Sequence, residues 1–364
     1  MAKVSPDLVA AVKKDFAALG TNSVVGDVDK YLAAFVGPAP YIAVDTRPLD
    51  KRSNPFDTKF LSSHVAWKLA SLVSWLFVNR PVGDPVRAGI PKIVSALRKV
   101  LADKRSTWVL ESKYWDEEKA PKRRKRHDAM TALVGGKPVG AGKAKGTWLE
   151  GRDDGTLILA PSAPDAKGED ATVYGAFYTA KLDDKTAPRI LAYAKAISDW
   201  PELETLPTAQ HIISAGFAAL GDRVAKTPVA AGSWEANPSA SAPALVAKVA
   251  AAHKLSSEAA ALYLQTLALP EPTKTNVLVW NGWTTPQYET AAAEIVQGKL
   301  VTQAKVDGAG RAIFAPGGVK KKTKLNLPLE ETKLAFTTHG RFVKHLITQP
   351  CHALFAHAYE RAKR

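Results

Sequence analysis

Apolar residues recur every three or four positions along much of this chain, which is the spacing of amphipathic helices. Between residues 61 and 78, for example, Val65, Leu69, Leu72 and Leu76 fall on one helical face. Segments of the same kind, bounded by capping residues, glycines and prolines, predict further helices at residues 5–19, 28–36, 91–101, 188–200, 208–220, 242–253 and from 350 onward. We therefore expect a mainly helical chain.

The pattern changes after Ser106, where short segments rich in β-branched and aromatic residues predict strands at 107–110, 147–150, 156–160 and 172–179. A polar turn joins the two middle segments, which indicates antiparallel pairing. The connection at 119–146 carries a run of like charges and the glycines Gly135, Gly136, Gly140, Gly142 and Gly146. We expect it to be a long, exposed and flexible loop. The predicted fold class is α+β, mainly helical, with a small antiparallel sheet.

A chain of 364 residues is long enough for two or three domains. Changes in composition divide it into a helical N-terminal region at 1–105, the sheet with further helices at 106–225, a linker at 226–241, a helix–hairpin module at 242–325 and a C-terminal extension with a helix at 326–364.

The module has the most distinctive order of elements, namely three helices and a hairpin. Ser256 or Ser257 can cap the first helix, and prolines close it. The second helix, Thr273–Trp280, ends at Asn281-Gly282. The third is capped by Thr285 and ends at Gly298, where we expect a left-handed residue.

Two strands, Leu300–Val306 and Arg311–Ala315, follow with a turn at Asp307–Gly310. This order resembles a winged-helix module, and the resemblance covers residues 255–318 only. It implies a DNA-associated protein whose third helix enters the major groove while the hairpin, or wing, touches the DNA backbone. The third helix, however, carries Glu289 and Glu294 and has no lysine or arginine. Binding through the wing, with weak sequence preference, is therefore favoured over base readout.

The formal charge of +15 is concentrated rather than spread evenly. Between Lys119 and Lys145, nine lysines and arginines face Asp128 as the only acidic residue. Such a cluster either attracts a polyanion or merely keeps a surface solvated, and both interpretations remain open. The candidate nucleic-acid contacts are Lys122, Arg123, Arg124, Lys125, Arg126, Lys143, Lys145, Lys299, Lys305, Arg311, Lys320, Lys321 and Lys322.

Aromatic residues accompany this basic segment. They are Trp108, Trp115, Trp148, Tyr174, Phe177 and Tyr178. Such residues can stack on the bases of single-stranded nucleic acid or form the core of a small sheet, and we favour the core.

The alternative function is a protein-interaction module in an adaptor or structural subunit of a larger assembly, because an acidic, alanine-rich third helix suits a protein interface. Its candidate partner surface is Trp280, Trp283, Glu289 and Glu294.

Motifs for enzyme chemistry are incomplete. A phosphate-binding loop fails because Ala144 follows Gly142-Lys143 where a hydroxyl is needed, and Lys137 stands where the leading glycine belongs. The histidines at 339, 345, 352 and 357, beside Cys351, lack the spacing of metal ligands. We therefore expect no enzyme activity, no cofactor or metal, and no small-molecule substrate.

The most apolar stretch, residues 61–78, contains His64 and Lys68, so we expect a buried helix there and no contact with a membrane. A single cysteine, Cys351, suits a reducing compartment. The expected location is the cytoplasm.

Overall fold

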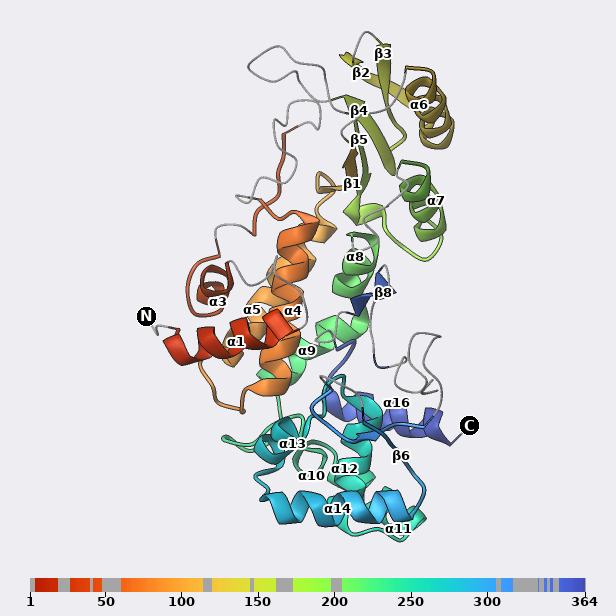
Figure 1. Cartoon of the computed structure of the whole chain (residues 1–364). Helices are drawn as coiled ribbons and strands as arrows, with labels where there is room; N and C mark the ends of the chain where they lie inside the picture. The colour runs from red at the N-terminus through yellow and green to blue at the C-terminus, as the bar shows by residue number, and fades with distance from the viewer. Residues whose placement is uncertain are drawn as a thin grey trace. The chain divides into compact units, whose positions relative to one another are not determined.

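The computed structural model describes residues 4–18, 27–39, 42–47, 60–113, 120–144, 147–161, 173–197, 205–305, 309–316, 333, 337–338, 341–342 and 347–363 (Figure 1). They belong to two compact units. The first unit comprises Met1–Pro38, Leu69–Val94 and Ala215–Arg364, and the second comprises Ala39–Lys68 and Ser95–Ser214. The chain thus leaves and re-enters each unit, so these units do not follow consecutive stretches of sequence.

The second unit contains a five-stranded antiparallel sheet in the order β1-β5-β4-β3-β2. Its strands are β1 (Thr107–Lys113), β2 (Lys137–Ala144), β3 (Thr147–Asp153), β4 (Leu157–Pro161) and β5 (Val173–Tyr178). Four of them are the predicted strands. Together with the many helices of the chain, this small antiparallel sheet confirms the mainly helical α+β class. Strand β4 has Leu157 and Ile158 buried in succession, so both faces of the sheet centre are covered.

Helices α6 (Ala120–Val134) and α7 (Ala187–Ile197) lie on the same side of this sheet (Figure 1). Helix α6 packs against β3, β4 and α7, whereas α7 packs against β1 and β5. The second unit also includes the short 3-10 helix η4 (Thr179–Lys181) and α8 (Thr205–Ile213).

The prediction of a flexible loop at 119–146 is wrong, because α6 and β2 occupy most of this segment. One of its glycines, Gly136, allows close packing of the backbone. Gly136, with φ +76°, passes so near β3 that an added Cβ would lie 2.1 Å from the carbonyl oxygen of Asp153. Only glycine fits such a backbone position without strain. Only two apolar residues among the described side chains of α6, Met130 and Val134, are buried, and the run of cations before them conceals the helical pattern.

The first unit is helical. Its helices are α1 (Pro6–Ala18), α3 (Val28–Val36), α9 (Ala215–Ala225), α10 (Pro238–Ser241), α11 (Pro243–His253), α12 (Ser257–Ala268), α13 (Lys274–Asn281), α14 (Thr285–Gln297), α16 (Cys351–Ala362) and the 3-10 helix η2 (Arg87–Gly89). Helices α4 (Ser63–Asn79) and α5 (Ile90–Ala102) have residues in both units. The predicted helices are confirmed except for 208–220, which is two helices, α8 and α9. The break falls at Ser214, whose hydroxyl donates to the carbonyl of His211.

Helix α12 is the centre of the module that was predicted as three helices and a hairpin. Every residue from Ala259 to Ala268 is buried, and α10, α11, α14 and α16 pack around it. Ser256 caps it, because its Oγ accepts a hydrogen bond from the N–H of Ala259 at 3.1 Å. A helix with no exposed face can only be the core of its unit.

Two local details of α14 differ from expectation. Its N-cap is Thr284 rather than Thr285, and the N–H of Thr284 donates to Oε1 of Gln287 in a capping box. Gly298 is right-handed at φ −68°, whereas Lys299 adopts the left-handed conformation at φ 55°. The helix ends at Gln297, and the left-handed residue that follows it is Lys299 instead of Gly298.

The predicted hairpin is present but shorter. Strands β6 (Thr302–Gln303) and β7 (Ile313–Phe314) pair antiparallel, and the N–H of Ala304 donates to the carbonyl of Ala312. Residues 306–308, at the predicted turn, lie outside the described residues. A second pair, β8 (Thr337–Thr338) with β9 (Arg341–Phe342), follows it in sequence.

The prediction of a linker at 226–241 is wrong. Glu235 and Ala236 are fully buried, and α10 lies within the segment. This stretch is packed because Glu235 pairs with arginines of the first unit, an interaction that no local sequence pattern predicts. Among the helices that the structure describes, none combines the length and the apolar character that a membrane span requires.

Candidate functional site

Helix α6 is held against the sheet through its second half. Met130 and Val134 are buried, and so is His127, whose Nε2 donates to the carbonyl of Glu150 on β3 at 3.0 Å. These residues stand three and seven positions apart, so they share one face of the helix. Helix α6 is therefore a fixed part of the second unit.

The C-terminal end of α6 is fixed by an arginine of the neighbouring helix. The Nη2 of Arg189, on α7, donates to the carbonyls of Leu133 at 2.7 Å and Val134 at 3.2 Å, and it also binds the carboxylate of Asp154. The last carbonyls of a helix have no partner within the helix, so a cation is favourable there.

At the N-terminal end of α6, by contrast, the cations lie where the helix dipole disfavours them. Five consecutive cations occupy the first half of the helix, Lys122, Arg123, Arg124, Lys125 and Arg126. Lys125 is exposed, whereas the side chains of the other four lie outside the described residues. A cation in the first turn opposes the helix dipole by typically about 0.3–1 kcal/mol, and neighbouring cations repel one another. Bound anionic groups would relieve both effects.

The edge strand β2 continues the basic character. Lys137 is exposed at its start, opposite Asp153 of β3. Lys143 belongs to the same strand, and its side chain and the whole of Lys145 lie outside the described residues. The basic segment is thus a helix followed by an edge strand.

The hairpin contributes fewer available cations than expected. Lys299 and Lys305 are exposed. Arg311, in contrast, is half-buried, with its Nη1 donating to the carbonyl of Pro270 at 3.5 Å and its guanidinium 4.8 Å from the ring centre of Phe314. Its role is to hold the hairpin against the end of α12, so we no longer count it as a nucleic-acid contact. Residues 320–322 lie outside the described residues.

The four residues of the expected partner surface do not form one exposed surface. Trp280 is buried, with its Nε1 donating to Oδ1 of Asn79 at 3.3 Å, so it belongs to the core. Glu294 accepts hydrogen bonds from Ser256, and Glu289 forms an exposed ion pair with Lys274 at 3.0 Å.

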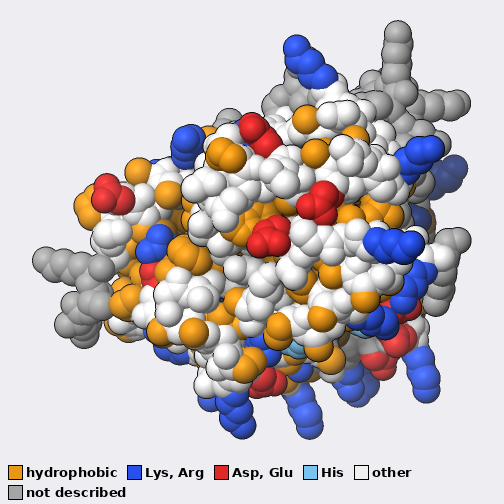
Figure 2. Space-filling view, turned by 90° about the horizontal axis from the view of Figure 1, so that it is seen from below, with side chains coloured by type: hydrophobic (Ala, Val, Ile, Leu, Met, Phe, Trp, Pro, Cys, Tyr) orange, Lys and Arg blue, Asp and Glu red, His pale blue; other side chains and the backbone are white. Residues whose placement is uncertain are grey.

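What remains on this surface is Glu289, together with the half-buried Trp283. Near them, Val279 of α13 is 51% exposed. Seen from the side of α11 and α14, apolar and acidic side chains occupy the middle of the view, and lysines and arginines stand towards the rim (Figure 2).

Three of the six aromatic residues around the basic segment are confirmed as core, whereas Tyr178 is only partly buried and its hydroxyl donates to Asp153. Trp108 and Phe177 are fully buried, and Tyr174 is nearly so. The Nε1 of Trp108 donates to the carbonyl of Leu61 at 3.2 Å. The side chains of Trp115 and Trp148 lie outside the described residues. The stacking surface therefore loses half of its proposed members.

Cys351 belongs to a buried polar cluster. The carboxylate of Glu235 accepts from Nε of Arg223 at 2.9 Å and lies 3.8 Å from Nη2 of Arg87. Burial and Glu235 raise the pKa of the Cys351 thiol, and burial lowers the pKa of His352. A fully buried thiol with a raised pKa is a poor nucleophile, so Cys351 is no candidate for nucleophilic catalysis.

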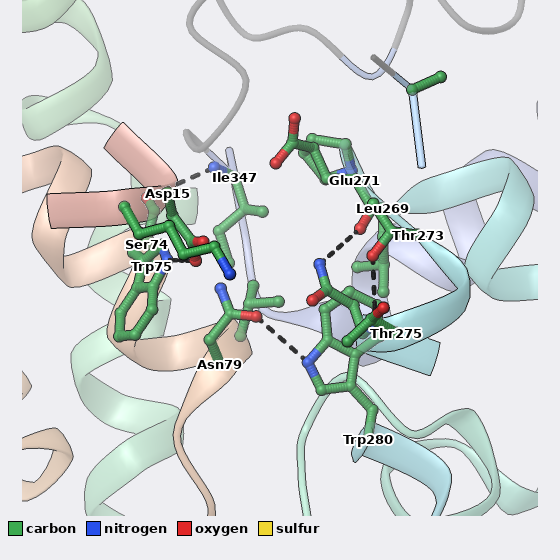
Figure 3. Close-up of a pocket in the computed structure, with 15 residues that line it drawn as sticks. Asp15, Ser74, Trp75, Asn79, Leu269, Glu271, Thr273, Thr275, Trp280 and Ile347 are labelled. Carbon is green, nitrogen blue, oxygen red and sulfur yellow. Dashed lines mark hydrogen bonds between the residues drawn. The ribbon is translucent and has the colours of Figure 1, made fainter. Parts of the chain in front are cut away.

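A cavity of about 270 Å³ opens beside the first-unit helices α1, α4 and α13 (Figure 3). Its polar lining includes Asp15, Asn79, Glu271 and Asn276. Sequence reasoning missed this site because its side chains come from separate helices and none belongs to a motif.

No protein-family model matches the chain, and neither a curated protein nor a solved structure matches it.

Proposed function

We propose that this protein binds nucleic acid, with duplex DNA as the expected ligand, through the basic half of α6 and with little sequence preference. One observation carries the proposal. The five cations from Lys122 to Arg126 are on a helix whose other half packs on the sheet through one buried face. A solvated loop could spread such charges apart, whereas a fixed helix holds them together and concentrates their field.

Weak sequence preference follows from the types of residue available. Lysine and arginine clusters contact phosphates, which carry no sequence information. Helix α14, which would read bases in a winged helix, has no lysine or arginine. The winged-helix resemblance therefore supports a secondary role, in which Lys299 and Lys305 add backbone contacts.

The cytoplasm is the location that we propose, because a single cysteine suits a reducing compartment. No step of the proposed function requires a cofactor.

Fluorescence anisotropy with labelled oligonucleotides tests the proposal. The probes are two 20-base-pair duplexes of unrelated sequence, a single strand and an RNA hairpin. We expect both duplexes to bind with similar affinity. Replacement of the five cations at 122–126 by glutamine, which preserves helix propensity, should weaken binding at least about tenfold at low salt.

The matched control removes five exposed lysines from other elements. It carries glutamine at Lys104, Lys181, Lys185, Lys195 and Lys226. Its net charge equals that of the α6 variant, so its affinity should stay within about threefold of wild type if position rather than total charge decides binding. Equal losses of DNA affinity in the two variants would mean that total charge alone decides binding, and they would contradict the proposal.

The exposure of Val279 favours a second candidate function, the protein-interaction module. Val279 is exposed on α13, which packs against α14 and is joined to the acidic Glu289 of that helix by the ion pair of Lys274. Exposed apolar side chains near acidic ones suit a protein partner better than DNA. If this candidate is correct, the double variant Val279→Glu, Trp283→Ala loses a cross-linked partner and keeps wild-type affinity for DNA.

A further inference from the structure

A chain of contacts connects the polar residues that line the cavity of the first unit (Figure 3). The Nε1 of Trp75, on α4, donates to Oδ2 of Asp15, on α1, at 2.9 Å. One turn further along α4, Asn79 accepts through its Oδ1 from Nε1 of Trp280 at 3.3 Å. Trp280 in turn stands one turn after Asn276 on α13. Because residues four positions apart on a helix are neighbours, these contacts bring Asp15, Asn79 and Asn276 to the wall of one cavity.

Each of these three residues keeps an atom for a ligand. Trp75 occupies Oδ2 of Asp15, which leaves Oδ1 as an acceptor. Asn79 uses its Oδ1, so its Nδ2 remains as a donor. Nδ2 of Asn276 donates to the carbonyl of Glu271 at 3.0 Å, so its Oδ1 remains as an acceptor. Glu271 also lines the cavity, but it already has a partner in the protein, so we do not count it among the groups open to a ligand.

The groups that are open to a ligand include one charge of each sign. Lys14 precedes Asp15 on α1 and lines the cavity as an exposed residue. Within the described ranges, neither Lys14 nor Asp15 forms an ion pair. Burial raises the pKa of Asp15, whereas Trp75 and the nearby charge of Lys14 lower it. A ligand with a single charge would leave one of the two side chains unmatched, whereas a zwitterion matches both.

We propose that this cavity binds a zwitterionic amino acid with an apolar side chain. The ammonium of the ligand donates to the Oδ1 atoms of Asp15 and Asn276. Its carboxylate accepts from Nδ2 of Asn79 and from the ammonium of Lys14. Its side chain packs on the apolar part of the lining, which comprises Val78, Leu269 and Ile347.

The size of the cavity suits a ligand of this kind. Its volume of about 270 Å³ is just below the range of sites for drug-sized ligands, about 300–1,000 Å³. A few fixed polar groups on an apolar background are the usual lining of a small-molecule site. This site does not depend on the basic helix α6, which belongs to the second unit.

Isothermal titration calorimetry of the full chain tests the site with three probes that share the side chain of leucine. They are L-leucine, its decarboxylated analogue isoamylamine and its deaminated analogue isocaproate. We expect leucine to bind and each analogue to bind at least about tenfold more weakly, because each one lacks a charged group that a side chain of the cavity would bind. No binding of leucine at millimolar concentration would overturn the proposal, and so would an analogue that binds as tightly as leucine.

Two charge variants of α1 locate the site, and a third variant is the control. Asp15→Asn keeps an acceptor for Trp75 and should weaken leucine binding at least about tenfold, and isocaproate should then bind more tightly than isoamylamine. Lys14→Gln, at an exposed position, should also weaken leucine binding and should give the reverse order of the two analogues. Lys13→Gln, on the same helix but outside the cavity lining, should bind leucine as wild type does. Leucine binding that survives both Asp15→Asn and Lys14→Gln would refute the assignment, whether or not DNA binding is confirmed.

Discussion

The carboxylate of Glu294, on α14, accepts hydrogen bonds from both the backbone N–H and the hydroxyl of Ser256, each at 2.8 Å. Ser256 in turn caps α12, the buried helix at the centre of the module. Glu294 therefore joins the third helix of the module to the start of the first. A residue that the sequence offered as a partner contact is instead a structural one.

The replacement Glu294→Ala should lower the free energy of unfolding by about 1–2 kcal/mol, because the N–H of Ser256 loses its acceptor in a half-buried place. Glu289→Ala on the same helix is the matched control. Its exposed ion pair with Lys274 should contribute no more than about 0.5 kcal/mol. Urea unfolding followed by circular dichroism measures both values, and equal values would contradict the structural role of Glu294.

Two glycines test whether the basic segment is ordered. Gly136 and Gly155 both have positive φ, but an added Cβ meets the backbone of Asp153 only at Gly136 and meets nothing within 4 Å at Gly155. We expect Gly155→Ala to cost about 1 kcal/mol of strain. Gly136→Ala should cost clearly more, because β2 must move away from β3.

Thermal and urea unfolding of the two glycine variants provide the measurement. If Gly136→Ala were no more destabilising than Gly155→Ala, β2 would not be packed as described. The fixed position of α6, which precedes β2 directly, would then lose its support.

The pH dependence of stability should reveal His211, on α8. Burial lowers its pKa to about 4, from an ordinary value near 6.5. As pH falls from 6.5 towards 4, the unfolded chain takes up a proton that the folded chain excludes, so the free energy of unfolding decreases by about 3 kcal/mol. Above pH 6.5 this contribution to stability is fully present.

Urea unfolding at closely spaced pH values checks the expectation. In His211→Gln the side chain no longer titrates, so the dependence between pH 6.5 and 4 should flatten by the equivalent of about one proton. A variant with the same slope as wild type would show that another group causes the effect.

Sequence reasoning was most accurate where the structural signals are local. Helix α3 begins and ends at the predicted residues, because its apolar spacing and the glycine after it lie within a few positions of each other. The cap, predicted at Ser256 or Ser257, and the end of the second helix at Asn281-Gly282 were found for the same reason. Local patterns also located four of the five strands.

Features that depend on distant residues could not be found in this way. Helix α6 resembled a loop because Arg189 and the carbonyl of Glu150, which hold it, come from other elements. Glu235 looked like part of a linker because its partners, Arg223 and Arg87, are supplied by α9 and η2. The same is true of the cavity, where a tryptophan of α4 orients Asp15 of α1.

The salt dependence of binding to duplex DNA tests the central claim most directly. If the cations of α6 contact phosphates, the logarithm of the affinity should fall linearly with the logarithm of the salt concentration. The slope should become shallower by about 3 to 5 when the five cations at 122–126 are replaced by glutamine, since each phosphate contact contributes about 0.9. A wild-type slope that the α6 variant retains, or no affinity for DNA at low salt, would contradict the account.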